Sequence, residues 1–302
     1  MTDILSELEK NSNIKLSDAQ KKAIREKICN VLMYTPKIGI LGKTGVGKSS
    51  LCNALFGKDV CKISDIQSCT RDPQEIFLQI GLQNKGLNLL DLPGVGESQE
   101  RDEEYSKLYK KLLPELDLIL WVLKGDDRAF SNDENFYNLI SSYFTEDTKK
   151  PFYFVINQVD KIEPFREWNE HEHRPGDKQF ININRKVEAV SKIFGFPKSK
   201  IIPVSANEKF NLVELIDNII RDLPNKQIVS MAPHIDKNNI SSESRGKIKI
   251  AFEDTVYDVV YDVTSNKGLA QMARGAVKVA KGVIDIITAP VSKVLDFFSS
   301  LF

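Results

Sequence analysis

The sequence has few of the features that mark secreted, metal-rich or membrane-spanning proteins. Its 302 residues include only 4 cysteines and 3 histidines, and no two cysteines form a C-x-x-C pair. No stretch of about 18 residues is both apolar and uncharged, which argues against a membrane-spanning helix. The early acidic residues Asp3, Glu7 and Glu9 are not typical of a secretory signal. These absences favour a reducing, cytoplasmic location.

An excess of charge of either sign is also absent. Lysine and arginine together number 42, as do aspartate and glutamate, so the formal net charge is zero. A balanced chain does not indicate a nucleic-acid partner by charge. The hydrophobic share of 41% and the charged share of 28% are typical of a soluble globular protein. The length suggests about two domains.

Apolar runs typical of strands alternate with segments of helical periodicity over residues 36–224. This alternation predicts an α/β fold with a mostly parallel, six-stranded sheet covered by helices on both faces. The expected strands are 37–41, 74–80, 87–91, 116–122, 152–157 and 201–204. The expected helices are 50–56, 101–113, 133–144, 180–194 and 212–221.

Three further segments flank this domain. Residues 1–35 are expected to be helical, with Ser17 and Asp18 capping a helix whose apolar residues recur at helical spacing. Residues 225–247 are rich in Asn, Ser and Lys, and we interpret them as a linker. Residues 248–302 form a C-terminal segment, and its second half has the pattern of an amphipathic helix.

The most informative motif follows the first expected strand and matches G-x-x-x-x-G-K-[ST]. In a strand–loop–helix context this pattern predicts a phosphate-binding loop, because its backbone N–H groups and the helix N-terminus attract phosphate oxygens. Lys48 is expected to reach the β- and γ-phosphates, and Ser49 to offer its hydroxyl to Mg²⁺. The predicted nucleotide-binding residues here are Gly42, Lys43, Thr44, Gly45, Val46, Gly47, Lys48, Ser49 and Ser50.

Two motifs predict the groups around the γ-phosphate. Asp91-Leu92-Pro93-Gly94 follows an expected strand, so Asp91 can hold the Mg²⁺ shell and Gly94 can give a backbone N–H to the γ-phosphate. Thr70 lies in the loop before residues 74–80 and is expected to ligate Mg²⁺ as part of a switch loop. Ser68 is the rival for that position. Lys48, Thr70 and Gly94 are therefore the predicted catalytic groups.

Two later strand ends predict recognition of guanine. Asn157 is expected to pair with the O6/N7 edge of the base, and Asp160 to accept from the N1–H and N2–H₂ donors that adenine lacks. Gln158 stands where such motifs usually have lysine, and its stem can still cover part of the ring. The turn at Ser205, Ala206 and Asn207 can present a backbone N–H to O6. The expected ligand is therefore GTP or GDP with Mg²⁺.

Taken together, GKTGVGKS, Thr70, DLPG, NQVD and SAN resemble the Era/TrmE-like P-loop GTPases over about residues 36–224. The run Leu113–Val122, which leads into Lys124–Arg128, looks like that of the bacterial YfjP-type GTPases. The phosphate loop is also similar to that of septin, Toc and GIMAP-type GTPases. These resemblances imply a GTP-hydrolysing enzyme and make dimerisation through the GTPase face an open alternative.

The sequence departs from its relatives at two positions. Era/TrmE-like proteins often have an asparagine that helps to bind K⁺ where this chain has Gly45. Ras-like proteins have a water-orienting glutamine where this chain has Val95. The resemblance therefore implies slow intrinsic hydrolysis and a water-positioning group supplied by an activating protein or a second subunit.

Other polar residues outside the motifs have competing interpretations. Arg71 and Arg128 could each act as an arginine finger, although a solvated loop position is favoured for both. His171 and His173 form H-x-H, which suits zinc, but no third ligand has a sensible spacing, and a solvated loop is favoured. The adjacent carboxylates at 126–127 are interpreted as structural or partner-facing.

The helix expected over residues 267–298 has a basic stripe beside a wide apolar face, and residues 267–302 carry a net charge of +3. Three interpretations stay open: packing within the chain, peripheral contact with an anionic membrane, and helix–helix association through glycines spaced seven residues apart.

The sequence as a whole is compatible with two functions. One is a hydrolysing molecular switch or assembly regulator; the other is a membrane-associated, dimerising GTPase.

Overall fold

A computed structural model of the chain describes residues 9, 14–57, 77–80, 87–91, 110, 112–141 and 150–279, with the backbone alone at 77–80 and 87–91. The chain divides into two compact units. The α/β unit comprises Lys37–Gln79 and Asn88–Ile219, and the helical unit comprises Met1–Pro36, Ile80–Leu87 and Ile220–Phe302.

The α/β unit is built around a sheet with the strand order β2-β3-β1-β4-β5-β6. β1 runs parallel to both β3 and β4, and β5 runs parallel to both β4 and β6. The expectation of a mostly parallel sheet is confirmed for these pairings. The strands are β1 (Lys37–Leu41), β2 (Phe77–Ile80), β3 (Leu87–Asp91), β4 (Leu118–Lys124), β5 (Phe152–Asn157) and β6 (Ile201–Pro203).

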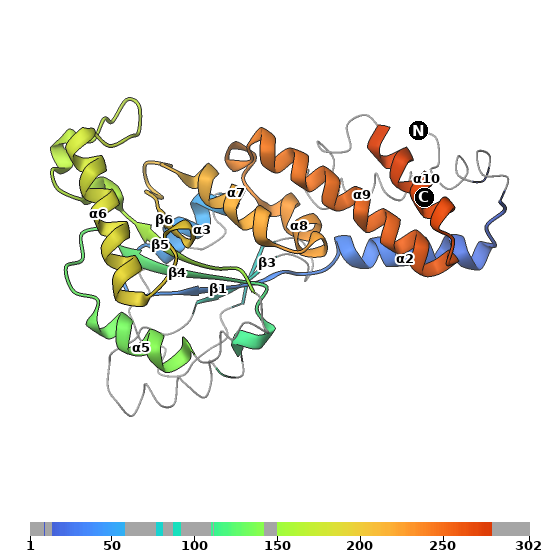
Figure 1. Ribbon diagram of the computed structural model, residues 1–302, viewed down its shortest axis with the longest axis horizontal. Helices are drawn as coiled ribbons and strands as arrows, with labels where there is room; N and C mark the ends of the chain where they lie inside the picture. The colour runs from blue at the N-terminus through green and yellow to red at the C-terminus, as the bar shows by residue number, and fades with distance from the viewer. Residues whose placement is uncertain are drawn as a thin grey trace. The chain divides into compact units, whose positions relative to one another are not determined.

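Helices lie on both sides of this sheet (Figure 1). One core cluster joins α5 and α6 to alternate residues of the strands, among them Trp121, Phe154 and Ile156. On the other face, the Tyr153 hydroxyl donates a hydrogen bond of 2.8 Å to the Asn218 carbonyl of α7. The helices of the unit are α3 (Lys48–Phe56), α5 (Ser131–Ser141), α6 (Asp177–Phe194) and α7 (Leu212–Asp222).

Trp121 lies at the centre of the first of these two cores. Its side chain is fully buried, and its ring centroid lies 6.0 Å from that of Phe136, 5.8 Å from Tyr137 and 5.6 Å from Phe154. Such tilted and edge-on aromatic contacts add to the energy of simple burial. The expectation that Trp121 belongs to the core is confirmed.

The expected elements agree with the structure to within about three residues at each described end. β1, β3 and β5 have the expected bounds, whereas β4 begins at Leu118, two residues later than expected. The reason is that Leu113–Glu115 forms a 3-10 turn (η1) containing Pro114, and the chain becomes extended only after it. The expected helix 101–113 lies mostly outside the described residues.

The helical unit contains α2 (Asp18–Leu32), α8 (Asn225–Met231), α9 (Ser242–Thr264) and α10 (Lys267–Val279). Ser17 caps α2 in a capping box with Gln20, as the sequence predicts. The long helix α9 contacts α2, α8 and α10, and Figure 1 shows α2 and α10 along it. Its buried residues are Ser244, Ile248, Ala251, Phe252, Glu253, Thr255, Val256, Val259 and Val260.

The expected linker 225–247 differs most from the structure. It contains α8, the 3-10 turns η6 (Ala232–His234) and η7 (Lys237–Asn239), and the start of α9. Ile228, Val229 and Met231 are buried, so this stretch belongs to the core of its unit rather than joining two parts. Ser241 caps α9, and Lys226, Lys237 and Asn238 are exposed, so composition alone does not separate this stretch from a linker.

The described part of the amphipathic C-terminal helix packs against its own chain. α10 buries Leu269, Ala270, Ala273 and Val277, and α9 lies against it. Arg274 of the expected basic stripe forms an ion pair of 2.8 Å with Asp254 of α9. Residues 280–298 lie outside the described residues. Over the residues that are described, no helix has the length and apolar character needed to cross a bilayer.

Candidate nucleotide-binding site

The register of the parallel strands brings the sequence motifs to one edge of the sheet. Ile40, two residues before the phosphate loop, pairs with Asp91, and Lys124 pairs with Asn157. Ile156 pairs with Pro203, which places the 205–207 turn beside the end of β5. The carboxyl ends of parallel strands are where open α/β sheets bind ligands, and four of the predicted motifs lie there.

The phosphate loop owes its path to three glycines with positive φ. Gly42, Gly45 and Gly47 have φ values of 139°, 84° and 87°, which side chains on L-residues rarely permit. A Cβ atom at Gly42 would lie 2.3 Å from the Val122 carbonyl oxygen, and one at Gly47 would lie 2.5 Å from Asn157 Nδ2. Gly42 and Gly47 are therefore required both by conformation and by close neighbours.

Helix α3 begins directly at this loop. Its N-cap, Gly47, has no side chain to cap the first turn, so that turn presents backbone N–H groups of the kind that bind anions. Ser49 and Ser50 lie in the first turn and are partly exposed. The Lys48 ammonium folds back over the loop and donates to the carbonyl oxygens of Gly42 at 2.7 Å and Lys43 at 3.2 Å.

The Asn157 side chain connects the phosphate loop to the turn at residues 205–207. Its Nδ2 donates to the carbonyl oxygens of Val46 at 2.9 Å and Gly47 at 3.4 Å, and its Oδ1 accepts from the Ala206 N–H at 3.0 Å. The side chain is only 1% exposed. Both ends of the amide thus bind backbone groups of the protein, and its contact with the O6/N7 edge of guanine stays a prediction.

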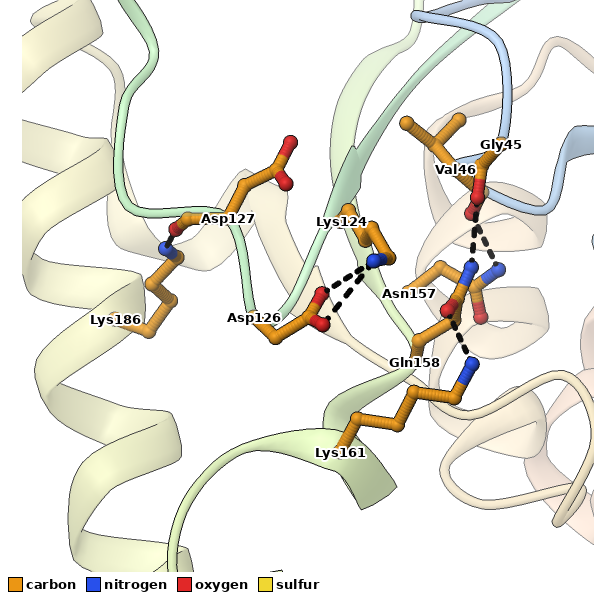
Figure 2. Close-up of polar contacts among 9 residues, drawn as sticks. All are labelled: Gly45, Val46, Lys124, Asp126, Asp127, Asn157, Gln158, Lys161 and Lys186. Carbon is orange, nitrogen blue, oxygen red and sulfur yellow. Dashed lines mark hydrogen bonds and ion pairs between the residues drawn. The ribbon is translucent and has the colours of Figure 1, made fainter.

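Gln158 continues this connection at the surface. Its Nε2 donates to the Gly45 carbonyl oxygen at 3.0 Å, and its Oε1 accepts from the Lys161 ammonium at 2.7 Å. Figure 2 shows the side chains of Asn157 and Gln158 reaching the phosphate loop side by side. Gln158 therefore contacts the phosphate loop, a contact that the motif pattern does not predict.

Asp160 lies one turn beyond, with its carboxylate held by Ser205. The Ser205 hydroxyl donates to Asp160 Oδ1 at 2.6 Å, and the backbone carbonyl of Asp160 accepts from buried Gln179 at 3.0 Å. Ser205 is fully buried, whereas Asp160 is partly exposed and Asn207 is exposed. A carboxylate oriented by a neighbouring hydroxyl suits a ligand with paired N–H donors.

A buried ion pair supports the phosphate loop from the α5 side. The Lys43 ammonium lies 2.5 Å from the carboxylate of Asp133, which is 2% exposed. Burial raises the pKa of Asp133, and Lys43 and the indole of Trp121 act in the opposite direction. Nothing in the sequence singles out Asp133, because a carboxylate in the first turn of a helix is ordinarily a solvated dipole partner.

The segment between the Asn157–Asp160 motif and α6 packs on the loop 205–210. Trp168 contacts Phe210 with ring centroids 5.5 Å apart, and His173 Nδ1 lies 2.9 Å from a Glu208 carboxylate oxygen. His171 is exposed. The described residues contain no group of three His, Cys, Asp or Glu side chains that could hold a metal ion, and a zinc site at H-x-H thus finds no support among them.

Several predicted groups cannot be placed. Thr70 and Gly94 lie outside the described residues, as do Ser68, Arg71 and Val95, and Asp91 is described by its backbone alone. The carboxylates at 126–127 take part in local contacts: Asp126 pairs with Lys124, and the Asp127 carbonyl accepts from Lys186. Arg128 is exposed.

Comparisons with known proteins agree with the motifs. A family described as 50S ribosome-binding GTPase matches residues 37–158. The uncharacterised Escherichia coli K12 protein YfjP is 38% identical, over 87% of this chain and 91% of YfjP. YkfA from the same organism is 35% identical, over 90% of this chain and 91% of YkfA.

A more distant relative has a descriptive name. GTPase Era of Aquifex aeolicus is 29% identical, over 62% of this chain and 56% of Era. The similarity to YfjP and YkfA extends through both units, whereas the match to the GTPase family covers the strands from β1 to β5 and ends at residue 158. The chain belongs to the YfjP-type P-loop GTPases and is a GTP-hydrolysing enzyme.

Proposed function

We propose that the protein is a GTP-driven molecular switch or assembly regulator that hydrolyses GTP to GDP with the help of a partner protein or a second copy. The single observation that carries the proposal is the position of Asn157. Its buried amide joins the phosphate loop to the 205–207 turn. A ligand that contacts both loops, as a nucleoside triphosphate would, therefore binds two loops that Asn157 already holds together.

Base recognition is assigned to the groups around this amide. The Asp160 carboxylate accepts from the N1–H and N2–H₂ groups of guanine, held in orientation by the Ser205 hydroxyl. The backbone N–H groups of the 205–207 turn are candidates for O6. Adenine offers no paired donors to Asp160 and would leave that carboxylate without partners, which is the general basis of such discrimination.

Phosphate and metal binding are assigned to the loop and to the start of α3. Lys48 moves from the loop carbonyls to the β- and γ-phosphates, while the backbone N–H groups of residues 45–50 hold their oxygens. The hydroxyl of Ser49 suits Mg²⁺, which prefers oxygen ligands. Asp91 fits the same role, because its register beside Ile40 places it near the loop. When bound, Mg²⁺ neutralises charge that develops on the phosphate oxygens.

Thr70 and Gly94 stay assigned to the switch loops that sense the γ-phosphate. Glutamine is absent at position 95, where valine stands, and this supports slow turnover by the isolated protein. The missing water-positioning group is assigned to a partner or a second subunit.

The membrane-associated alternative rests on the segment 267–298. The apolar residues of α10 are covered by α9, which favours packing within the chain for residues 267–279. Exposed Val279 at the end of the described helix keeps peripheral contact open for the residues beyond it. Co-sedimentation with anionic vesicles, with and without residues 280–302, distinguishes the two: equal binding removes the membrane alternative.

The proposal is tested by measuring GTP turnover as a function of protein concentration, in Na⁺ and in K⁺. We expect slow turnover whose specific rate rises with protein concentration if a second copy completes the site. A flat specific rate moves the missing group to another protein. Fast turnover by a dilute monomer in Na⁺ contradicts partner-assisted catalysis.

A further inference from the structure

We infer that Lys161 supplies the positive charge that the base-recognition motif lacks at position 158, and that it acts through the Gln158 amide. This inference rests on the proposed binding of guanine nucleotide. Gln158 and Lys161 together would supply the side-chain stem and the positive charge that a single lysine supplies in related motifs. Lys161 is thus a positioning residue for the nucleotide.

The contacts form a chain from a cation to the phosphate loop. The Lys161 ammonium donates to Gln158 Oε1 at 2.7 Å, and Gln158 Nε2 donates to the Gly45 carbonyl oxygen at 3.0 Å (Figure 2). A hydrogen bond from a charged donor polarises the amide and strengthens the bond that its other end makes. Removing Lys161 would therefore weaken the contact at Gly45 without touching it.

The backbone makes this geometry hard to avoid. Gln158 adopts the left-handed conformation, with φ 60° and ψ 38°, which is uncommon for a residue with a side chain. Gly125 packs against its carbonyl group, where a Cβ would lie 2.9 Å from the oxygen. The next turn is 3-10, with the Lys161 N–H donating to that same Gln158 oxygen at 3.1 Å. Residues 158 and 161 therefore share one face of the turn.

The charge of Lys161 is available for this purpose. The neighbouring cation, Lys124, is paired with Asp126, and Figure 2 shows that pair beside the Gln158–Lys161 contact. Within the described residues, no carboxylate lies at ion-pair distance from Lys161, whose side chain is exposed. An exposed lysine without a carboxylate partner usually points to solvent, so its seat on an amide that holds the phosphate loop is the feature to explain.

The test measures the affinity and dissociation rate of a fluorescent N-methylanthraniloyl GDP for four proteins: wild type, Lys161→Met, Gln158→Lys and the double variant. We expect Lys161→Met to weaken binding about tenfold, the effect of one charge-assisted hydrogen bond, through faster dissociation. Gln158→Lys is the second background, because it places a positive charge at position 158 itself. In that background Lys161→Met should have no effect.

Two controls separate this role from general charge and stability. Lys178→Met removes the same charge from the same unit, at a side chain that is 81% exposed, and should leave affinity unchanged. The thermal midpoint of the nucleotide-free protein should be equal in wild type and Lys161→Met. Equal affinity of these two proteins, or an equal loss in both backgrounds, overturns the inference. If wild type itself does not bind the fluorescent GDP, the proposed function fails instead.

Discussion

One ionisable group in each unit responds to burial in a different way. The α/β unit buries the Asp133 carboxylate against a lysine of the phosphate loop, so burial there serves the site. The helical unit holds His234 half-buried at the end of the 3-10 turn η6, and this partial burial lowers the pKa of the imidazole to about 4. Asp133 has a lysine ammonium beside it although burial raises its pKa, whereas the lowered pKa of His234 favours the neutral imidazole. The difference predicts that the units respond differently to substitution and to acid.

Lys48→Ala should have the largest effect, confined to the α/β unit. The ammonium lies over the phosphate loop, and losing its interaction with two phosphates should weaken GDP and GTP binding about thousandfold or more, about 4 kcal/mol. Titration with labelled nucleotide measures this. The far-UV circular dichroism should not change, since Lys48 is not buried. Retained binding would mean that the loop is not the phosphate site.

Lys43→Met should destabilise the α/β unit by about 4 kcal/mol, because it leaves the buried Asp133 carboxylate without its cation. Both tryptophans, Trp121 and Trp168, belong to this unit, so urea unfolding followed by tryptophan fluorescence reports on it selectively. The loss of unfolding free energy in this variant should become smaller as the pH falls, since protonation of Asp133 removes the unpaired charge.

A matched control lies on the same sheet. Lys37 pairs with Glu115 at 2.7 Å, but both side chains are well exposed, so Lys37→Met should cost less than about 1 kcal/mol. An equal loss of unfolding free energy in Lys37→Met and Lys43→Met would show that the Lys43–Asp133 pair is no more than a surface contact.

Acid should destabilise the helical unit first. Because the folded pKa of His234 is about 4 and the unfolded value is about 6.5, the unfolded chain binds more protons between these values, and stability falls as the pH is lowered through this window. The full loss of stability is at most about 3.4 kcal/mol. Asp133 acts oppositely, because its pKa is raised and protonation favours the folded α/β unit.

The measurement compares two signals during a titration from pH 7 to pH 4. The helical signal in the far ultraviolet should decrease before tryptophan fluorescence changes. His234→Gln removes the titrating group and should bring the two transitions together. Coincident transitions in the unmodified protein would contradict the contrast between the units.

The same contrast explains what sequence could predict. In the α/β unit, apolar runs ending in Gly42, Asp91 and Asn157 specify strands, register and site together, because parallel strands end at one edge. The Lys43–Asp133 pair and the contacts of Asn157 with Val46 and Ala206 could not be predicted, because each joins residues far apart in the sequence and leaves no local pattern. In the helical unit, the composition of residues 225–247 predicts a linker, because short helices with exposed polar residues resemble linkers in composition.

Asp160→Asn tests base recognition and should have the smallest effect of these substitutions on the α/β unit as a whole. The Ser205 hydroxyl that donates to Asp160 at 2.6 Å can equally donate to an asparagine oxygen, so the fold should be kept. The amide then presents one donor and one acceptor to the base, which suits xanthine, with its oxygen at position 2, better than guanine. The preference for GDP over XDP should fall about a hundredfold, about 2.7 kcal/mol, as measured by competition against labelled GDP.

Ser205→Ala is the matched control and should weaken the binding of both nucleotides alike, because it loosens the carboxylate without changing its hydrogen-bonding character. An unchanged preference in Asp160→Asn would remove Asp160 from base recognition while leaving the phosphate loop assignment intact, because Lys48 and Asp160 lie at opposite ends of the frame that Asn157 holds together.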